Sequence, residues 1–190
     1  MTIIISANQA KKQIATILKH IKHGEIFIYP TDTIYGIGCD ATNKVAVKLI
    51  RQLKNRDTKP FSIIAPSKQW IIQNCVVTQE AKHWLKKLPG PYTLILKLKN
   101  KRCIASNVSQ GQTIGVRIPK HWIAALVRNL KKPIVTTSAN LSGEPFMKSL
   151  DDLNIKIKEG VSFIMYEGAK QARPSTIFDL SQSKPVIIKR

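Results

Sequence analysis

The sequence has 190 residues, of which 43% are apolar, and this length and composition suit one domain with an ordinary buried core. Three widely spaced cysteines give neither a disulfide framework nor a pair of zinc ligands. No apolar run approaches the roughly 18 residues of a membrane span, and the N-terminus has no leader pattern. We therefore expect a single domain over residues 1–190, located in the cytoplasm and without a membrane partner.

The formal net charge of +20 is compatible with nucleic-acid binding, because Lys and Arg neutralise phosphates and release counterions. Most of the 31 basic residues are Lys, however, and they occur along the whole chain instead of in one block. An AT-rich genome would produce the same excess of Lys through its codons. The charge alone leaves both explanations open.

The chain alternates between helical and strand patterns. Apolar residues with the spacing of one helical face predict a helix over residues 7–22, which Gly24 would end, and Asn43 is the expected N-cap of a second helix. Helices are predicted at 7–22, 44–53, 68–74, 79–87 and 121–130. Strands are predicted at 25–29, 61–65, 92–99, 113–118, 134–137, 161–165, 176–180 and 186–189. This order favours an α/β fold, a twisted sheet covered by helices.

The first polar cluster, residues 30–38, follows the strand predicted at 25–29, and open α/β sheets bind ligands outside their strand ends. It contains two threonines, an aspartate and a tyrosine, but Pro, Asp and Gly are also common in simple turns. Gly36 and Gly38 match part of a dinucleotide-binding pattern. They do not come directly after the strand, so this match is weak.

The second and third clusters also suit anion binding. Residues 54–59 hold three cations at a predicted helix end, where cations are favoured in any case, yet Lys and Arg would also clamp a triphosphate. Residues 136–143 carry four hydroxyls and an amide after a buried strand, which is more than a helix cap needs. Such groups form a neutral cradle for phosphate or carboxylate oxygens.

Residues 173–176 form a thinner cluster of the same kind, and Arg117 at a strand end is a further candidate anion ligand. The sequence contains no phosphate-binding loop, no nucleophile elbow and no zinc-protease motif. The four histidines have no acidic or Cys companion at ligand spacing, so no protein metal site is predicted.

Five motifs occur in the order typical of one family: Thr31-Asp32-Thr33-x-Tyr35-Gly36-x-Gly38, Lys54-x-Arg56, Gly115-Val116-Arg117-Ile118-Pro119, Ser138-Ala139-Asn140-Leu141-Ser142-Gly143 and Pro174-Ser175-Thr176. Together they resemble the YrdC-like threonylcarbamoyl-AMP synthases of the TsaC type. The resemblance implies a single YrdC-like domain, with an open mixed α/β sheet and a concave basic face.

The resemblance also implies a reaction in which L-threonine, bicarbonate or CO2 and ATP, with Mg²⁺, give threonylcarbamoyl-adenylate and pyrophosphate. A transfer complex would then move the threonylcarbamoyl group to tRNA. Catalytic roles are implied for Lys54, Arg56, Ser138 and Asn140. ATP is expected at Arg56, Lys59, Thr113, Ser138 and Asn140. L-threonine is expected at Thr31, Thr33, Tyr35, Arg117, Thr136 and Ser175.

The segment after Arg56 departs from the family pattern. Asp57 stands where Pro is usual, and Lys59 comes one residue early, which leaves its role open. Arg190 is a further candidate contact to the nucleotide. One alternative function is a non-catalytic binder of structured RNA, either tRNA or double-stranded RNA. Another is the carbamoyl-adenylate chemistry of YrdC-like modules in hydrogenase-maturing carbamoyltransferases.

Overall fold

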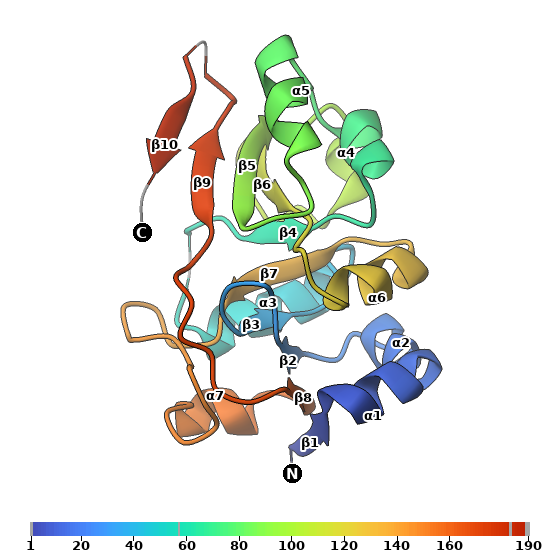
Figure 1. Ribbon diagram of the computed structural model, residues 1–190, viewed down its shortest axis with the longest axis vertical. Helices are drawn as coiled ribbons and strands as arrows, with labels where there is room; N and C mark the ends of the chain where they lie inside the picture. The colour runs from blue at the N-terminus through green and yellow to red at the C-terminus, as the bar shows by residue number, and fades with distance from the viewer. Residues whose placement is uncertain (1, 57, 183, 189–190) are drawn as a thin grey trace.

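Ten strands form one mixed sheet in the order β1-β8-β2-β3-β7-β4-β6-β5-β9-β10 (Figure 1). The computed structural model describes residues 2–56, 58–182 and 184–188. The strands are β1 (Ile3–Ser6), β2 (Phe27–Tyr29), β3 (Gly36–Gly38), β4 (Ser62–Ile64), β5 (Tyr92–Lys97), β6 (Thr113–Arg117), β7 (Ile134–Ser138), β8 (Phe163–Tyr166), β9 (Thr176–Asp179) and β10 (Val186–Ile188). The helices are α1 (Ala7–Lys12), α2 (Ile14–Lys22), α3 (Lys44–Leu53), α4 (Lys68–Asn74), α5 (Gln79–Lys86), α6 (Ile123–Leu130) and α7 (Ile155–Glu159), with a 3-10 turn at Lys101–Cys103.

The predicted alternation of helices and strands is confirmed, and so are two helix boundaries. The side chain of Asn43 accepts hydrogen bonds from the N–H groups of Val45 and Ala46 at the start of α3, at 3.0 and 3.1 Å. Gly24 follows α2 with φ +85°, a conformation that costs glycine little. Local signals for capping and stopping a helix were therefore sufficient at these points.

The single helix predicted over residues 7–22 is wrong, because Gln13 leaves helical geometry and separates α1 from α2. The apolar spacing belongs to α2 alone, whereas Ala10 is the only buried residue of α1. Three short elements, β1, β3 and α7, had not been predicted.

Gly36 and Gly38 lie in β3 and do not form a dinucleotide-binding turn. This strand pairs with β2 on one side and with β7 on the other. A Cβ atom on Gly38 would lie 2.6 Å from the carbonyl oxygen of Val135 and 2.7 Å from the ring of Tyr29. The glycines therefore allow close packing of Tyr29 over the sheet.

Helices cover both faces of the central strands. Successive residues of a strand point to opposite sides, so each face contributes to its own core cluster. Phe27 and Tyr29 belong to a core cluster with α1, α2 and α6, and Figure 1 shows α2 and α6 side by side. Ile28, between them, belongs to a second cluster with α3, α4, α5 and α7. None of the helices in the described ranges is long and apolar enough to span a membrane.

Small and polar residues replace apolar ones on one face of β7, β4 and β6. The strand register places Thr136 opposite Ser62, Ser62 opposite Gly115, and Gly115 opposite Ile95. These four residues therefore form a row across four adjacent strands. Their neighbours Val135, Ile63, Val116 and Leu94 point to the other face and are buried in the core. The row forms the floor of the candidate site.

Candidate active site

A polar cavity of about 200 Å³ lies over this floor. It is enclosed by the loop after β2, the ends of β6 and β7, and the segment that leads into β9. Its lining residues are Thr31, Ile34, Tyr35, Gly36, Arg56, Pro60, Ser62, Thr93, Arg117, Thr136, Thr137, Ser138, Pro174 and Ser175. Hydroxyl groups and two guanidinium groups dominate this list, so the cavity suits a small ligand with a negative charge.

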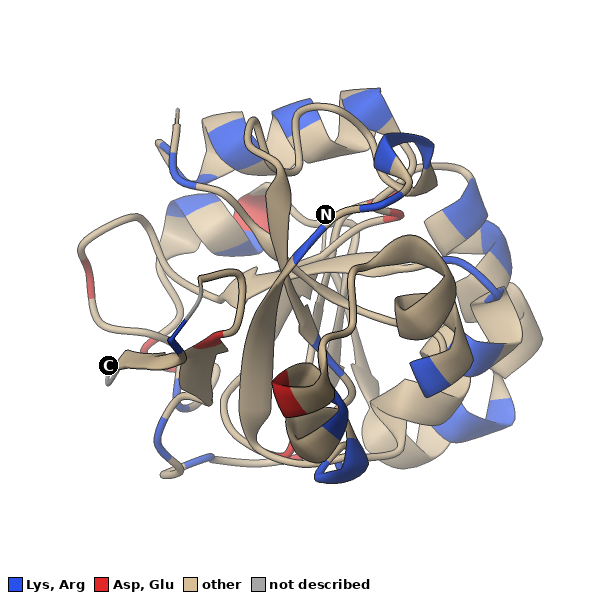
Figure 2. Ribbon diagram, turned by 90° about the horizontal axis from the view of Figure 1, so that it is seen from above, with Lys and Arg blue, Asp and Glu red and all other residues tan. Residues whose placement is uncertain are grey.

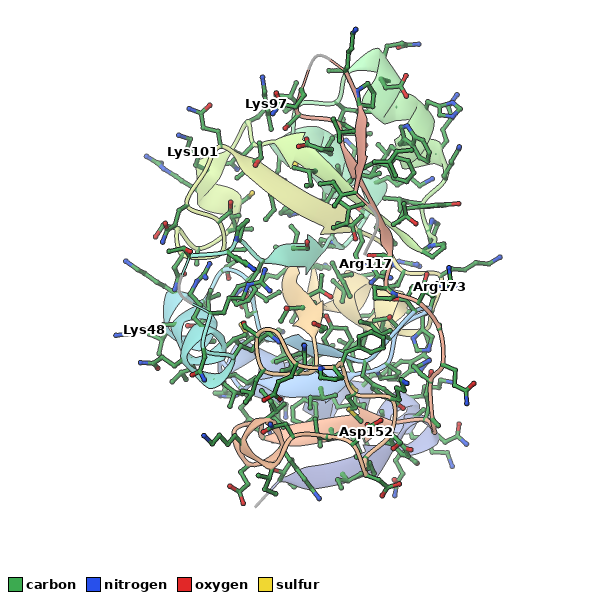
Figure 3. All side chains as sticks on the ribbon, turned by 90° about the vertical axis from the view of Figure 1, so that its left-hand side faces the viewer. Lys48, Lys97, Lys101, Arg117, Asp152 and Arg173 are labelled. Carbon is green, nitrogen blue, oxygen red and sulfur yellow. The ribbon has the colours of Figure 1, made fainter. Side chains whose placement is uncertain are left out.

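Arg117, the last residue of β6, is the buried cation of this cavity (Figure 3). Its Nη2 atom lies 2.5 Å from Oδ1 of Asp32, and the Thr33 hydroxyl accepts from its Nη1 atom at 3.3 Å. Asp32 also accepts from the backbone N–H of Lys120 at 2.8 Å. Burial lowers the pKa of Arg117, and the carboxylate of Asp32 opposes this shift.

The Nε atom of Arg117 is buried and has no hydrogen-bond partner among the described residues. A buried donor without a partner is costly, and its cost falls when a ligand supplies the acceptor. Asp32 and Thr33 therefore fix the guanidinium in place, while its Nε–H group lacks an acceptor among the described residues.

The Thr31 and Tyr35 side chains shape the wall of the cavity through contacts with backbone groups. The Thr31 hydroxyl donates to the carbonyl oxygen of Ile34 at 2.7 Å and accepts from the N–H of Thr33 at 3.1 Å. The Tyr35 hydroxyl donates to the carbonyl oxygen of Gly168 at 2.7 Å. Burial raises the pKa of Tyr35 to about 12, so the phenol remains protonated.

Ser175 closes the cavity from the segment that precedes β9. Its hydroxyl lies 2.8 Å from the hydroxyl of Thr93 on β5, and Thr93 also lines the cavity. Both residues are buried. This contact joins the C-terminal part of the chain to the floor strands.

A second cavity, of about 260 Å³, adjoins the first over the same floor. The two cavities share Arg56, Pro60 and Ser62. The remaining lining residues of the second are Lys59, Phe61, Ile95, Thr113, Gly115 and Ile177. This cavity combines two cations from the loop after α3 with apolar side chains of the floor.

Arg56 stands where the two cavities meet. Its guanidinium donates to the carbonyl oxygens of Lys59 at 3.1 Å and Pro60 at 2.6 Å, and to the hydroxyl of Thr137 at 3.3 Å. Arg56 is only partly buried. These contacts hold the guanidinium of Arg56 at the boundary, where Arg56 lines both cavities.

Lys54 lies behind the cavities and does not line either of them. Its Nζ atom donates to the carbonyl oxygen of Ser138 at 2.6 Å, to the carbonyl oxygen of Asn140, and to Oδ1 of Asn140 at 3.2 Å. Burial and then the charge of Arg56 lower the pKa of Lys54 to about 7, whereas the three oxygens favour the ammonium form. Lys54 thus ties the loop after β7 to the end of α3.

Ser138 and Asn140 are also coupled directly, since the Ser138 hydroxyl donates to Oδ1 of Asn140 at 2.6 Å. The Asn140 amide donates to the carbonyl oxygen of Glu144 at 2.6 Å. Ser138 lines the first cavity, and Asn140 supports it from behind.

The structure brings most of the predicted site residues together. Five of the six residues expected to contact L-threonine line the first cavity, and the sixth, Thr33, holds Arg117 from behind. Of the residues expected at ATP, Arg56, Lys59 and Thr113 line the second cavity. Ser138 lines the first cavity, Asn140 lines neither, and Arg190 lies outside the described residues.

Sequence reasoning did not assign site roles to Asp32, Thr137, Ser62 and Thr93. Asp32 and Thr137 lie inside clusters that had been recognised as polar, so their residue types were the available signal. Ser62 and Thr93 lie in predicted strands. Only the strand pairing shows that they face the cavities.

No group of three or more His, Cys, Asp or Glu side chains gathers to hold a metal ion in the described part of the chain. The carboxylate of Asp32, which holds Arg117 in the first cavity, is engaged by Arg117 and Lys120. A magnesium ion that arrives with a nucleotide would therefore rely on phosphate oxygens and water, which is a usual mode for Mg²⁺.

Comparison with known sequences identifies the family. The sequence profile of the Sua5/YciO/YrdC family, which bears the description "Telomere recombination", matches residues 19–190. The chain belongs to this family. Within it, a Methanocaldococcus jannaschii protein is 34% identical over 97% of this chain and 88% of its own length. A Vibrio vulnificus protein named threonylcarbamoyl-AMP synthase is 31% identical over 86% of this chain and 91% of its own length.

Comparison with solved structures agrees with this family. The structure of P. abyssi Sua5 complexed with L-threonine has a TM-score of 0.88 to this chain, with 28% sequence identity. The match covers 100% of this chain and 57% of Sua5, so the present chain spans less than two thirds of that relative. The expected α/β fold with an open mixed sheet is thereby confirmed.

Proposed function

We propose that this chain is a nucleotidyltransferase that makes threonylcarbamoyl-adenylate and pyrophosphate from L-threonine, bicarbonate or CO2, and ATP. The product serves the threonylcarbamoyladenosine modification of tRNA, through a transfer complex in the cytoplasm. The curated relatives named threonylcarbamoyl-AMP synthase, matched over most of their length, support this function. The structural relative complexed with L-threonine supports one of the substrates.

The observation that carries the proposal is the pair of adjoining cavities that share Arg56. In the first, Arg117 and its surrounding hydroxyls suit the carboxylate and hydroxyl groups of L-threonine. In the second, Lys59 and Arg56 suit a triphosphate, and Thr113 and the apolar floor suit the rest of a nucleotide. The amine of the amino acid and the α-phosphate would then meet near Arg56.

The residues present suit a reaction that needs no enzyme nucleophile. The amine of threonine and CO2 form a carbamate with loss of a proton. A carbamate oxygen then attacks the α-phosphorus, and the bond to pyrophosphate breaks. No Asp, Glu, His or Cys occurs among the described residues that line the two cavities. The protein therefore contributes positioning and a positive field for the phosphate charge.

Roles follow for the four residues of the predicted catalytic set. Arg56 contacts the phosphates directly, and the Ser138 hydroxyl faces the same space from β7. Lys54 and Asn140 hold Ser138 in place through the bonds described above. Mg²⁺, when bound, would neutralise the triphosphate, and the cations of the loop would complete its binding.

The direct test is an assay of the purified protein with ATP, Mg²⁺, L-threonine and bicarbonate. We expect release of pyrophosphate that depends on threonine, and formation of an adenylate with the mass of the threonylcarbamoyl product. Arg128→Met, on the exposed side of α6, is a control that should leave both unchanged. A folded protein that releases no pyrophosphate in response to threonine would contradict the proposal.

Direct binding of tRNA or double-stranded RNA is a second candidate function, and the net charge of +20 favours it. Figure 2 shows Lys and Arg on helices around the molecule, with far fewer Asp and Glu. If RNA binding is independent of the site, it should survive Lys54→Ala and Ser138→Ala, while adenylate formation does not. RNA binding that is lost equally in both variants would place RNA in the site itself.

A further inference from the structure

We infer that Arg51, a buried residue of α3 that lines neither cavity, is the positioning residue for the cationic loop of residues 54–60. This inference rests on the proposed function, because it gives the loop the task of holding the nucleotide phosphates. Arg51 would thereby set the affinity for ATP without touching ATP.

The loop has little regular structure of its own. Its second residue, Asn55, has a positive φ of +49°, a conformation that residues other than glycine rarely adopt. It then carries Arg56 and Lys59 to the second cavity before β4 begins at Ser62. A loop of this kind keeps one shape only when other groups fix its backbone.

The guanidinium of Arg51 supplies such groups. Its Nη1 atom donates to the carbonyl oxygens of Arg56 and Lys59, both at 3.1 Å. These are the backbone groups of the two cations that line the second cavity. One side chain therefore fixes the spacing of both backbone groups, and it does so without lining either cavity.

The opposite edge of the same guanidinium is anchored to a different part of the chain. Its Nε and Nη2 atoms donate to the carbonyl oxygens of Asn107 at 2.8 Å and Val108 at 3.3 Å. Val108 also accepts from the N–H of Phe61 at 2.9 Å. Arg51 thus clamps the loop against the segment before β6, and β6 itself supplies Thr113 and Arg117.

Phe61 completes the arrangement. Its ring centre lies 4.5 Å from the guanidinium carbon of Arg51 and 4.9 Å from that of Arg56. The carbonyl oxygen of Lys59 accepts from both arginines. The shared ring and the shared acceptor are therefore among the contacts that hold these two like charges near one another. Lysine could replace Arg51 only in part, because one ammonium group does not reach both sets of carbonyl oxygens at once.

The test compares ATP and L-threonine binding, measured by calorimetry, in the wild type, Arg51→Ala and Arg51→Lys. Inorganic triphosphate serves as a second probe of the loop. We expect ATP and triphosphate to bind roughly tenfold more weakly to Arg51→Ala, with a smaller loss for Arg51→Lys. The affinity for L-threonine, which is bound through Arg117, should change less than twofold.

Leu126→Ala is the matched control, since Leu126 is a fully buried residue of α6 that belongs to the core cluster on the opposite face of the sheet from α3. It should lower the melting temperature as Arg51→Ala does, but leave ATP affinity unchanged. Hydrogen exchange should show faster exchange over residues 55–61 in Arg51→Ala only. Equal losses of ATP and threonine affinity, or ATP affinity that Arg51→Ala leaves unchanged, would overturn the inference.

These binding measurements need no turnover, so they are separate from the test of the proposed function. A wild type that binds ATP but makes no adenylate would refute the proposed reaction and still allow Arg51 to be judged. A wild type that binds neither ATP nor triphosphate would overturn the role of Arg51 as well.

Discussion

Arg117 and Arg56 reach the same cavity, but they are held in different ways. Arg117 is buried at the end of a strand, where a carboxylate fixes it. Arg56 is partly exposed on a loop, where the carbonyl oxygens of Lys59 and Pro60 support it. A buried charge such as that of Arg117 needs a partner of opposite sign, which Asp32 supplies, whereas water also reaches the partly exposed Arg56. Arg117 therefore belongs to the folded core as well as to the site, and Arg56 belongs mainly to the site.

The largest effect is expected for Arg117→Met, which leaves the charge of Asp32 buried without its partner. The free energy of unfolding should fall by about 3 to 5 kcal/mol, as for other broken buried pairs. Chemical denaturation measures this change. Adding Asp32→Asn should restore much of the stability, while threonine binding stays lost in both variants. A double variant as unstable as Arg117→Met would contradict this account.

Arg56→Ala should weaken ligand binding but, unlike Arg117→Met, leave the stability of the fold almost unchanged. Loss of charge-assisted contacts to phosphate should weaken ATP binding by about 1.5 to 3 kcal/mol. The melting temperature should change little, because Arg56 is partly exposed and its loop remains clamped by Arg51. Calorimetric titration and a thermal melt on the same sample are sufficient. Unchanged ATP affinity and turnover would remove Arg56 from the site.

Lys54→Met should give an intermediate effect, because it removes the ammonium donor from the carbonyl oxygens of Ser138 and Asn140, although the Ser138 oxygen still accepts from the N–H of Asn140. The expected loss of stability is about 1 to 3 kcal/mol. Folding lowers the pKa of Lys54 from 10.5 to about 7, so the unfolded chain binds more protons between these pH values. The contribution of Lys54 to the free energy of unfolding therefore rises with pH across this window.

Urea denaturation at pH 7 and pH 9 checks this sign. The wild type should gain stability relative to Lys54→Met as the pH rises. If the difference between the two proteins stays constant over this range, the ammonium form persists in the folded state. In that case the three oxygen acceptors outweigh burial.

The smallest effect is expected for Ser175→Ala, which removes one neutral hydroxyl from the wall of the first cavity. Threonine affinity should fall by about 0.5 to 1.5 kcal/mol. Ser181→Ala is the matched control, since Ser181 is also buried and bonds to Asp179 outside both cavities. Equal effects of the two substitutions on threonine affinity would indicate that Ser175 does not contact the ligand.

The sequence predicts which residues belong to the site better than it predicts where their side chains lie. Thr31, Arg117 and Ser175 come from short motifs in which residue type and order carry the signal. Ser62 and Thr93 could not be found, because a hydroxyl inside a strand gives no sign of the face on which it lies until the strand pairing is known. The clamp by Arg51 also depends on tertiary contacts, since Asn107 and Val108 are more than 50 residues away.

The fold, like the site, has parts that local sequence signals predict and parts that depend on tertiary contacts. Helices with capping residues or regular apolar spacing, such as α2 and α3, were predictable from local signals. The strand β3 was not, because its glycines are typical of turns. Only contact with Tyr29 and Val135 makes glycine necessary there. For α2, α3 and most strands the element type thus follows from short-range chemistry, whereas β3 depends on contact with its neighbouring strands.

In the row of Thr136, Ser62, Gly115 and Ile95, the spacing between positions is set by the backbone of the sheet and not by the side chains. Backbone hydrogen bonds hold neighbouring strands about 4.8 Å apart, so the row places its side chains at regular steps. The steps are not all independent, because a Cβ atom on Gly115 would lie 2.5 Å from the hydroxyl oxygen of Ser62. A change of ligand specificity that places a side chain at Gly115 would therefore require Ser62 to change with it, and the two positions act as one step of the row.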